Sequence, residues 1–167
     1  MARKQTKNEN GNGYRFEIWG EHLFRQLGYH GVQRNVIYHV KSLLTRRRWT
    51  RQVDVQYNRL LDMSRLNLVS LVIVEFKYRP ACVDDVVRLE ETRGIVGADY
   101  AELALARRPS YAVQDKAERY GIRIYPPDEL RRHNVFPGKT LCQQVMGIRL
   151  NEYENKATIV NKRALRL

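Results

Sequence analysis

The sequence predicts an α/β fold in which helices flank a mixed β-sheet, in the order α-β-β-β-α-β-α-β, followed by a basic C-terminal extension. Three observations support this prediction. Apolar residues recur at helical spacing in three segments, five other segments have strand composition, and glycine or proline stands at several of the junctions between them. The chain of 167 residues has the length of one ordinary domain with a sizeable core.

The first half of the chain predicts one helix and three strands. Residues 1–12 are polar and lack hydrophobic periodicity, so we interpret them as a flexible basic arm. A helix is predicted over 14–28, where apolar residues recur every three to four positions and Gly28 ends the pattern. Strand composition follows over three segments, 32–44, 52–61 and 68–78. Because only a short turn-like segment separates the last two, we expect an antiparallel hairpin.

The second half alternates between predicted helices and strands. Valines at near-helical spacing predict a helix over 83–97, and Ser110 and Gly121 mark the cap and the stop of another helix. Two short strands are predicted in the same region, over 99–106 and 122–125. Helical connections of this kind allow consecutive strands to lie parallel, which predicts a mixed sheet.

The residues after the last predicted strand form a basic extension, 131–167, to which the sequence assigns no role. Within it, we expect a helix near 141–147 and strand pieces at 147–153 and 156–160.

The charge distribution predicts a polyanionic partner. The formal net charge is +12, with 11 Lys/Arg against 3 Asp/Glu in residues 1–51, 11 against 13 in 52–130, and 8 against 2 in 131–167. A nearly neutral centre with basic ends is typical of a protein that holds nucleic acid by its periphery. No apolar run approaches the roughly 20 residues of a membrane helix, so we expect an intracellular, cytoplasmic protein without a membrane partner.

Charged residues at the end of a buried strand indicate a functional site. The run "LVIVEFKYRP" begins as an apolar strand and then carries Glu75 and Lys77, which share a face because strand side chains alternate. Asp54 is the one acid in the neighbouring predicted strand. If the hairpin pairs so that these faces coincide, Asp54 and Glu75 meet with Lys77 beside them. Two carboxylates with open positions suit Mg²⁺ or Mn²⁺, so the sequence predicts a metal site for phosphate chemistry.

The same pattern resembles the PD-(D/E)xK superfamily of restriction-endonuclease-like nucleases, particularly its Mrr-like and archaeal Holliday-junction-resolvase-like branch. "GYRFE", ending at Glu17 and followed by "LGY", resembles the opening helix of Mrr-type domains. "QVDV" and "VEFKY" match the metal-binding aspartate and the (Q/E)-x-K strand, and "SYAVQDKAERYGIRIYPPDEL" resembles the closing helix and strand. The resemblance covers 13–130 and implies a nuclease-like domain over those residues.

The resemblance implies a role for each matched residue. Asp54 and Glu75 would bind Mg²⁺ (or Mn²⁺), Lys77 would assist the attacking water, and Glu17 would be the helix acid that contacts the metal or its waters. Glu21, one helical turn later, is the alternative helix acid. The implied activity is metal-dependent hydrolysis of DNA phosphodiester bonds by an endonuclease. Because cutting both strands of a duplex usually requires two sites, a homodimer is expected.

Several basic residues near this site are candidates for nucleic-acid binding. The segment "TRRRWTR" reads as an exposed connection that presents arginines to phosphates and a tryptophan for stacking. The candidate nucleic-acid-binding residues are Arg46, Arg47, Arg48, Trp49, Arg51 and Arg79.

Other interpretations stay open at this point. Within the same class, the protein would be a resolvase of Holliday junctions or other branched DNA. In a different class, it would be a non-catalytic DNA-binding module whose strand charges form a salt-bridged sheet edge, with Glu75 paired to Lys77 or Arg79.

Overall fold

The computed structural model describes residues 11–63, 66–133, 139–153 and 157–164. Its centre is a six-stranded sheet with the strand order β5-β4-β3-β2-β1-β6. The strands are β1 (His30–Ser42), β2 (Arg48–Met63), β3 (Leu66–Lys77), β4 (Tyr100–Leu105), β5 (Arg123–Tyr125) and β6 (Thr158–Ala164). The helices are α1 (Asn12–Gln26), α2 (Val83–Val96), α3 (Tyr111–Arg119), α4 (Pro127–Leu130) and α5 (Leu141–Met146), with a 3-10 turn η1 (Leu150–Glu152). None of the helices in the described ranges is long and apolar enough to span a membrane.

The strand pairing confirms the predicted mixed α/β sheet. β2 pairs antiparallel with β3, which confirms the predicted hairpin, and also with β1. β3, β4 and β5 run parallel to one another. The element order from α1 to β5 is the predicted one. Parallel pairing follows from the two helical connections, since α2 and α3 return the chain to the same end of the sheet.

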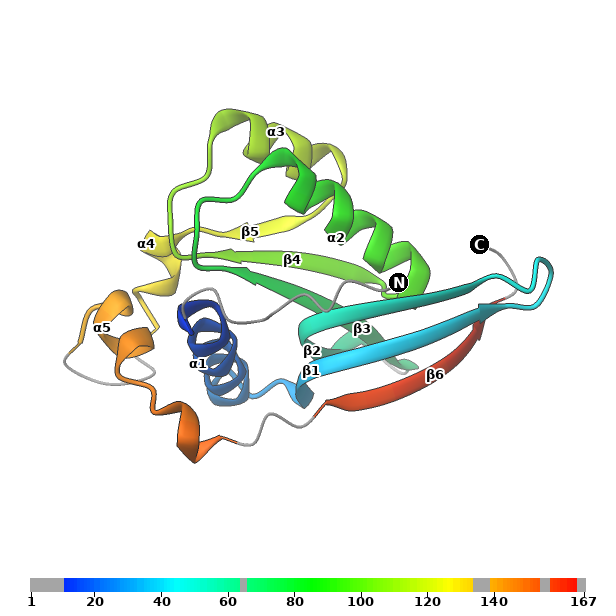
Figure 1. Cartoon of the computed structure of the whole chain (residues 1–167), viewed down its shortest axis with the longest axis horizontal. Helices are drawn as coiled ribbons and strands as arrows, with labels where there is room; N and C mark the ends of the chain where they lie inside the picture. Colours follow the sequence, from blue (N-terminus) through cyan, green and yellow to red (C-terminus); the bar gives the residue numbers. More distant parts are fainter. Residues whose placement is uncertain (1–10, 64–65, 134–138, 154–156, 165–167) are drawn as a thin grey trace.

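Helices cover both faces of the sheet (Figure 1). The core beneath α1 and α5 contains Phe16, Phe24 and Phe76, and the core beneath α2 and α3 contains Ile73 and Leu103. β3 is therefore buried on both faces, which accounts for its continuous apolar run.

The C-terminal extension is part of the folded sheet and core. β6 pairs parallel with the outer edge of β1, and Leu141 and Val145 of α5 join the core beneath α1. The indole Nε1 of Trp19 donates to Gln144 Oε1 at 2.9 Å, which ties α5 to α1. The predicted helix at 141–147 is confirmed as α5, and the strand piece predicted at 156–160 overlaps β6 from Thr158 to Val160, while residue 156 lies outside the described residues.

The structure differs from the sequence predictions in one element and at one helix boundary. The strand piece predicted over 147–153 is wrong, because this segment contains η1, whose backbone hydrogen bonds join Glu152 to Arg149 and Tyr153 to Leu150. At the other end, α1 begins at Asn12, inside the predicted arm. Residues 1–10 of that arm lie outside the described residues.

The close approach of α1 to β3 requires a glycine at position 20. A Cβ added there would lie 2.0 Å from Cζ of Phe76, a buried ring with little room to move. We expect Gly20→Ala to lower the free energy of unfolding by about 1–3 kcal/mol through overpacking, as measured by urea denaturation.

Gly94 of α2 provides the matched control for this substitution. A Cβ at Gly94 meets nothing within 4 Å, so Gly94→Ala is expected to stabilise by about 0.5–1 kcal/mol through helix propensity. Equal effects of the two substitutions would contradict the proposed packing of α1 on Phe76.

Candidate active site

The pairing of β2 with β3 brings Asp54 close to Glu75. Val55 of β2 pairs with Val74 of β3. Because the strands are antiparallel, the residue before Val55, Asp54, lies beside the residue after Val74, Glu75. The carboxylate Oδ2 of Asp54 accepts a hydrogen bond from the Phe76 amide at 2.9 Å, and the Asp54 residue is only 9% exposed. The register that the sequence left conditional is therefore the one in which the two acids meet.

Asp54 lies in an environment that disfavours a negative charge. Burial raises the pKa of its carboxyl well above the ordinary value, and the negative charges of Glu75 and Glu17 raise it further. Lys77 and the Phe76 amide act in the opposite direction but do not outweigh these effects. Glu17 of α1 is 7% exposed. Because its charge raises the pKa of Asp54, an acid from the helix contributes to the same electrostatic environment as the two strand acids.

Lys77 is held as an ammonium between two carboxylates. Its Nζ donates a hydrogen bond to Glu75 Oε1 and lies 3.7 Å from Asp85 Oδ1. Burial lowers the pKa of Lys77, but the charges of Glu75, Asp54 and Asp85 and the hydrogen bond to Glu75 outweigh it, so the pKa is raised. Lys77 therefore remains protonated at neutral pH and presents a positive charge and hydrogen-bond donors to the cavity.

Asp85, at the start of α2, is a site residue that the sequence analysis missed. Its carboxylate accepts from the Cys82 amide at 2.9 Å and binds the Arg79 guanidinium through two contacts of 2.6 and 3.0 Å. Burial opposes ionisation, but the hydrogen bonds from Arg79 and Cys82 and the charge of Lys77 lower the pKa of Asp85. Two acids in the first turn of α2 were visible in the sequence, but their helical position did not indicate that one of them reaches Lys77.

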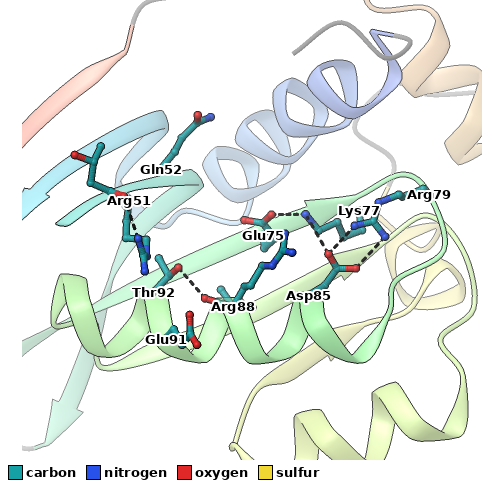
Figure 2. A pocket seen from close by; sticks show the side chains of 11 residues that line it. Arg51, Gln52, Glu75, Lys77, Arg79, Asp85, Arg88, Glu91 and Thr92 are labelled. Atoms are coloured by element: carbon teal, nitrogen blue, oxygen red, sulfur yellow. Dashed lines mark hydrogen bonds and ion pairs between the residues drawn. The ribbon is translucent and has the colours of Figure 1, made fainter. Parts of the chain in front are cut away.

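A cavity of about 570 Å³ opens beside these residues between α2 and the sheet. Figure 2 shows the contacts that run from Glu75 through Lys77 and Asp85 to Arg79, and shows Arg88 extending from α2 along the cavity. The lining residues are Thr50, Arg51, Gln52, Glu75, Lys77, Arg79, Asp85, Arg88, Leu89, Glu91 and Thr92. Arg88 is a second residue that the sequence analysis missed.

The two candidate helix acids have different surroundings. Glu21 forms ion pairs with Arg25 at 2.7 Å and with Arg34 at 3.0 Å. Glu17, in contrast, raises the pKa of Asp54 through its charge. Of the two, Glu17 is the acid whose charge acts on Asp54.

The predicted arginine-rich loop is divided between a turn and a strand. β2 begins at Arg48, so the prediction of one exposed connection is wrong for 48–51. Because side chains alternate along a strand, Arg51 lines the cavity beside α2, whereas Arg48 is exposed on the opposite face. Arg46 and Arg47 are exposed in the turn, and Trp49 is half-buried. The structure thus places only Arg51 and Arg79, of the six predicted nucleic-acid-binding residues, at the candidate active site.

The donor atoms around Asp54 suit a hard divalent cation. The acids near this position, Asp54, Glu75 and Glu17, offer only carboxylate oxygens. A bound cation would offset the repulsion that the negative charges of Glu75 and Glu17 exert on Asp54. Among the described residues, no group of three or more His, Cys, Asp or Glu side chains is placed so that it could hold a metal ion. Mg²⁺ usually retains several waters and uses only one or two carboxylates, so this donor set fits Mg²⁺ better than a metal that requires a full protein cage.

Comparison with known proteins finds structural relatives only. No protein-family model matches the chain, and a search of curated proteins finds no match. The protein VC1899 from Vibrio cholerae is similar over 74% of this chain and 32% of its own, with a TM-score of 0.54 and 21% identity. Can2 from Sulfobacillus thermosulfidooxidans, determined in complex with cyclic tetra-adenylate, is similar over 74% of this chain and 35% of its own, with a TM-score of 0.54 and 13% identity.

A third solved structure matches a larger share of both chains. AF1548, described as a protein of unknown function, is similar over 84% of this chain and 72% of its own, with a TM-score of 0.51 and 13% identity. The chain therefore spans about a third of VC1899 and Can2 and most of AF1548. At these identities the likeness shows a shared α/β fold.

Proposed function

We propose that this protein is a metal-dependent endonuclease that hydrolyses DNA phosphodiester bonds. The observation that carries the proposal is the convergence of Asp54, Glu75 and Lys77, with the charge of Glu17 acting on Asp54. Glu75 and Lys77 line a cavity that also contains arginines. A salt-bridged sheet edge explains the contact between Lys77 and Glu75. It does not explain why a third acid, Asp54, is buried where two other acids raise its pKa.

In this proposal Asp54 and Glu75 would hold Mg²⁺ or Mn²⁺, with Glu17 contacting the metal or its waters. The bound metal would polarise the scissile phosphate and lower the pKa of a metal-bound water. Binding would require Glu75 to exchange part of its interaction with Lys77 for the cation. Asp85 lies 3.7 Å from the Lys77 ammonium and would keep it in place during that exchange.

The remaining side chains would bind and orient the DNA strand. Lys77 would donate a hydrogen bond to the attacking water or to the phosphate oxygens, where negative charge develops. Arg51 and Arg88 line the cavity from opposite walls, β2 and α2, and would contact the phosphates on either side of the scissile bond. Arg79 would contribute after releasing one of its two bonds to Asp85.

The test is cleavage of supercoiled, linear and four-way-junction DNA with Mg²⁺ or Mn²⁺, compared with EDTA. Cleavage that requires the metal and is absent in Glu75→Gln is the expected result, while DNA binding by this variant is retained. Preference for the four-way junction, with a two-fold dimer by light scattering, would identify a resolvase. Salt-sensitive binding without cleavage of any substrate would identify a DNA-binding module and refute the enzymatic proposal.

A further inference from the structure

Three exposed cations form a row across the strands at one end of the sheet. Lys41 of β1 pairs with Arg48 of β2 on one side and with Arg163 of β6 on the other. All three residues are exposed. We infer that this cationic row (Arg48, Lys41 and Arg163) binds the phosphate backbone of nucleic acid on a surface separate from the candidate active site.

The row is unfavourable for the isolated protein. Neighbouring strands lie about 4.8 Å apart, and like charges directly opposite one another destabilise a sheet. The two adjacent rows on the same exposed face contain no acid that would neutralise the three cations. The nearer row is Thr50, His39 and Asn161, and the next is Gln52, Ile37 and Ile159. A polyanion bound across the strands would remove this repulsion.

The opposite face of the same strands is occupied by packing interactions. Lys162 donates from Nζ to the Val96 carbonyl at the end of α2 at 2.6 Å and lies over the Tyr38 ring, 5.2 Å from its centroid. Alternation along β6 then directs Arg163 to the exposed face. The C-terminal extension thus contributes a packing lysine and a neighbouring exposed arginine, and only the second belongs to the proposed surface.

The shape of this region suits an extended ligand. The β1–β2 hairpin, with β6 along its edge, projects beyond the helices (Figure 1). A hollow of about 590 Å³ lies along the three strands, and residues of both sheet faces line it. Its lining residues are His39, Val40, Lys41, Arg48, Trp49, Thr50, Asn161, Lys162 and Arg163. Hydroxyl, imidazole and amide groups next to the row supply the hydrogen-bond donors that commonly accompany arginine and lysine at a DNA backbone.

This inference rests on the nucleic-acid substrate of the proposed function but does not require cleavage. Arg51, which lines the cavity, and Arg48 of the cationic row point to opposite faces of β2, while Thr50 and Gln52, on the face of the row, also line the cavity. A single strand passing Lys77 would therefore not reach all three cations of the row. A duplex or branched DNA would instead be held at a second position by the projecting hairpin. The row would then anchor the DNA while Arg51 and Arg88 position the scissile phosphate.

The experiment measures binding of a fluorescein-labelled DNA duplex by anisotropy, in EDTA, at several salt concentrations. The test variant is the double substitution Lys41→Gln with Arg163→Gln. The control is Lys116→Gln with Arg119→Gln, which removes two cations from α3. The logarithm of the DNA association constant falls linearly with the logarithm of the salt concentration. Each lost phosphate contact should make this slope less steep by about 0.9 and should weaken binding by about tenfold at roughly 0.1 M salt. The melting temperature of the test variant should be unchanged or higher, because a repulsion is removed.

Duplex affinity and salt slope equal to those of the control would overturn the inference. So would a selective loss of binding to phosphatidylserine vesicles, because Leu43 and Leu44 are exposed near the hairpin tip and a membrane would also attract cations. Loss of duplex binding in a protein that cuts no DNA would support the cationic row and refute the proposed cleavage. Metal-dependent cleavage by the protein, with no effect of the double substitution on duplex binding, would support the proposed cleavage and refute the cationic row.

Discussion

Asp54→Asn is expected to abolish cleavage and, at the same time, to raise the melting temperature of the metal-free protein. The amide preserves the shape of the side chain and can still accept the hydrogen bond from the Phe76 amide. It removes the carboxylate proposed to bind the metal, which should reduce the cleavage rate on the order of 10³-fold. It also removes a carboxyl group whose ionisation is opposed by burial and by the charges of Glu75 and Glu17. A gain of about 1 kcal/mol would raise the melting temperature by about 2–4 °C.

The pH dependence of stability provides a second measurement on this variant. Below the ordinary pKa of 3.8, Asp54 is protonated in both the folded and unfolded states and has no cost. As pH rises above that value, the unfolded state releases its proton first, so folding becomes less favourable until the raised pKa of the folded protein is passed. The metal-free wild-type protein should therefore lose stability over this range, and Asp54→Asn should lose less.

Mg²⁺ distinguishes a metal ligand from a structural acid at this position. The ion should raise the melting temperature of the wild-type protein, because a ligand that binds only the folded state stabilises it, and should have little effect on Asp54→Asn. Asp115→Asn, an exposed acid on α3 that pairs with Arg119, is the control and should respond to Mg²⁺ like the wild type. If Asp54→Asn retains both Mg²⁺ stabilisation and cleavage, Asp54 is not a metal ligand.

Lys77→Ala is expected to lose cleavage while retaining metal binding. Loss of one donor that stabilises developing charge usually lowers the rate by about 10²–10³-fold. The acids that contact Lys77, Glu75 and Asp85, would lose their nearest ammonium. Their stronger negative potential should keep Mn²⁺ affinity, measured by calorimetry, equal to or higher than that of the wild type.

The combination of these two results is more informative than either activity measurement alone. Asp54→Asn should lose both metal binding and cleavage, whereas Lys77→Ala should lose only cleavage. Lys116→Ala on α3 controls for removal of a lysine and should leave both properties unchanged. If Lys77→Ala cuts DNA at the wild-type rate, Lys77 serves only as the counter-ion of Glu75, as in a structural salt bridge.

The local pattern of the sequence determined the order of helices and strands and the pair Glu75 and Lys77. Hydrophobic spacing reports the period of a helix or strand directly, and alternation alone places two residues at i and i+2 on one strand face. The helix and strand within the extension, α5 and β6, were also visible as local patterns. Their partners, α1 and β1, were not, because pairing across more than one hundred residues leaves no mark in a short window.

Only the tertiary structure decided which residues meet at the site. A slip of one residue between β2 and β3 would have moved Asp54 away from Glu75, and spacing within a single strand does not specify that register. The approach of Asp85 to Lys77 depends on how α2 packs on the sheet, and the separation of Arg48 from Arg51 depends on where β2 begins. The residue types that perform chemistry are thus encoded locally, whereas their convergence arises from contacts between segments that are distant in the chain.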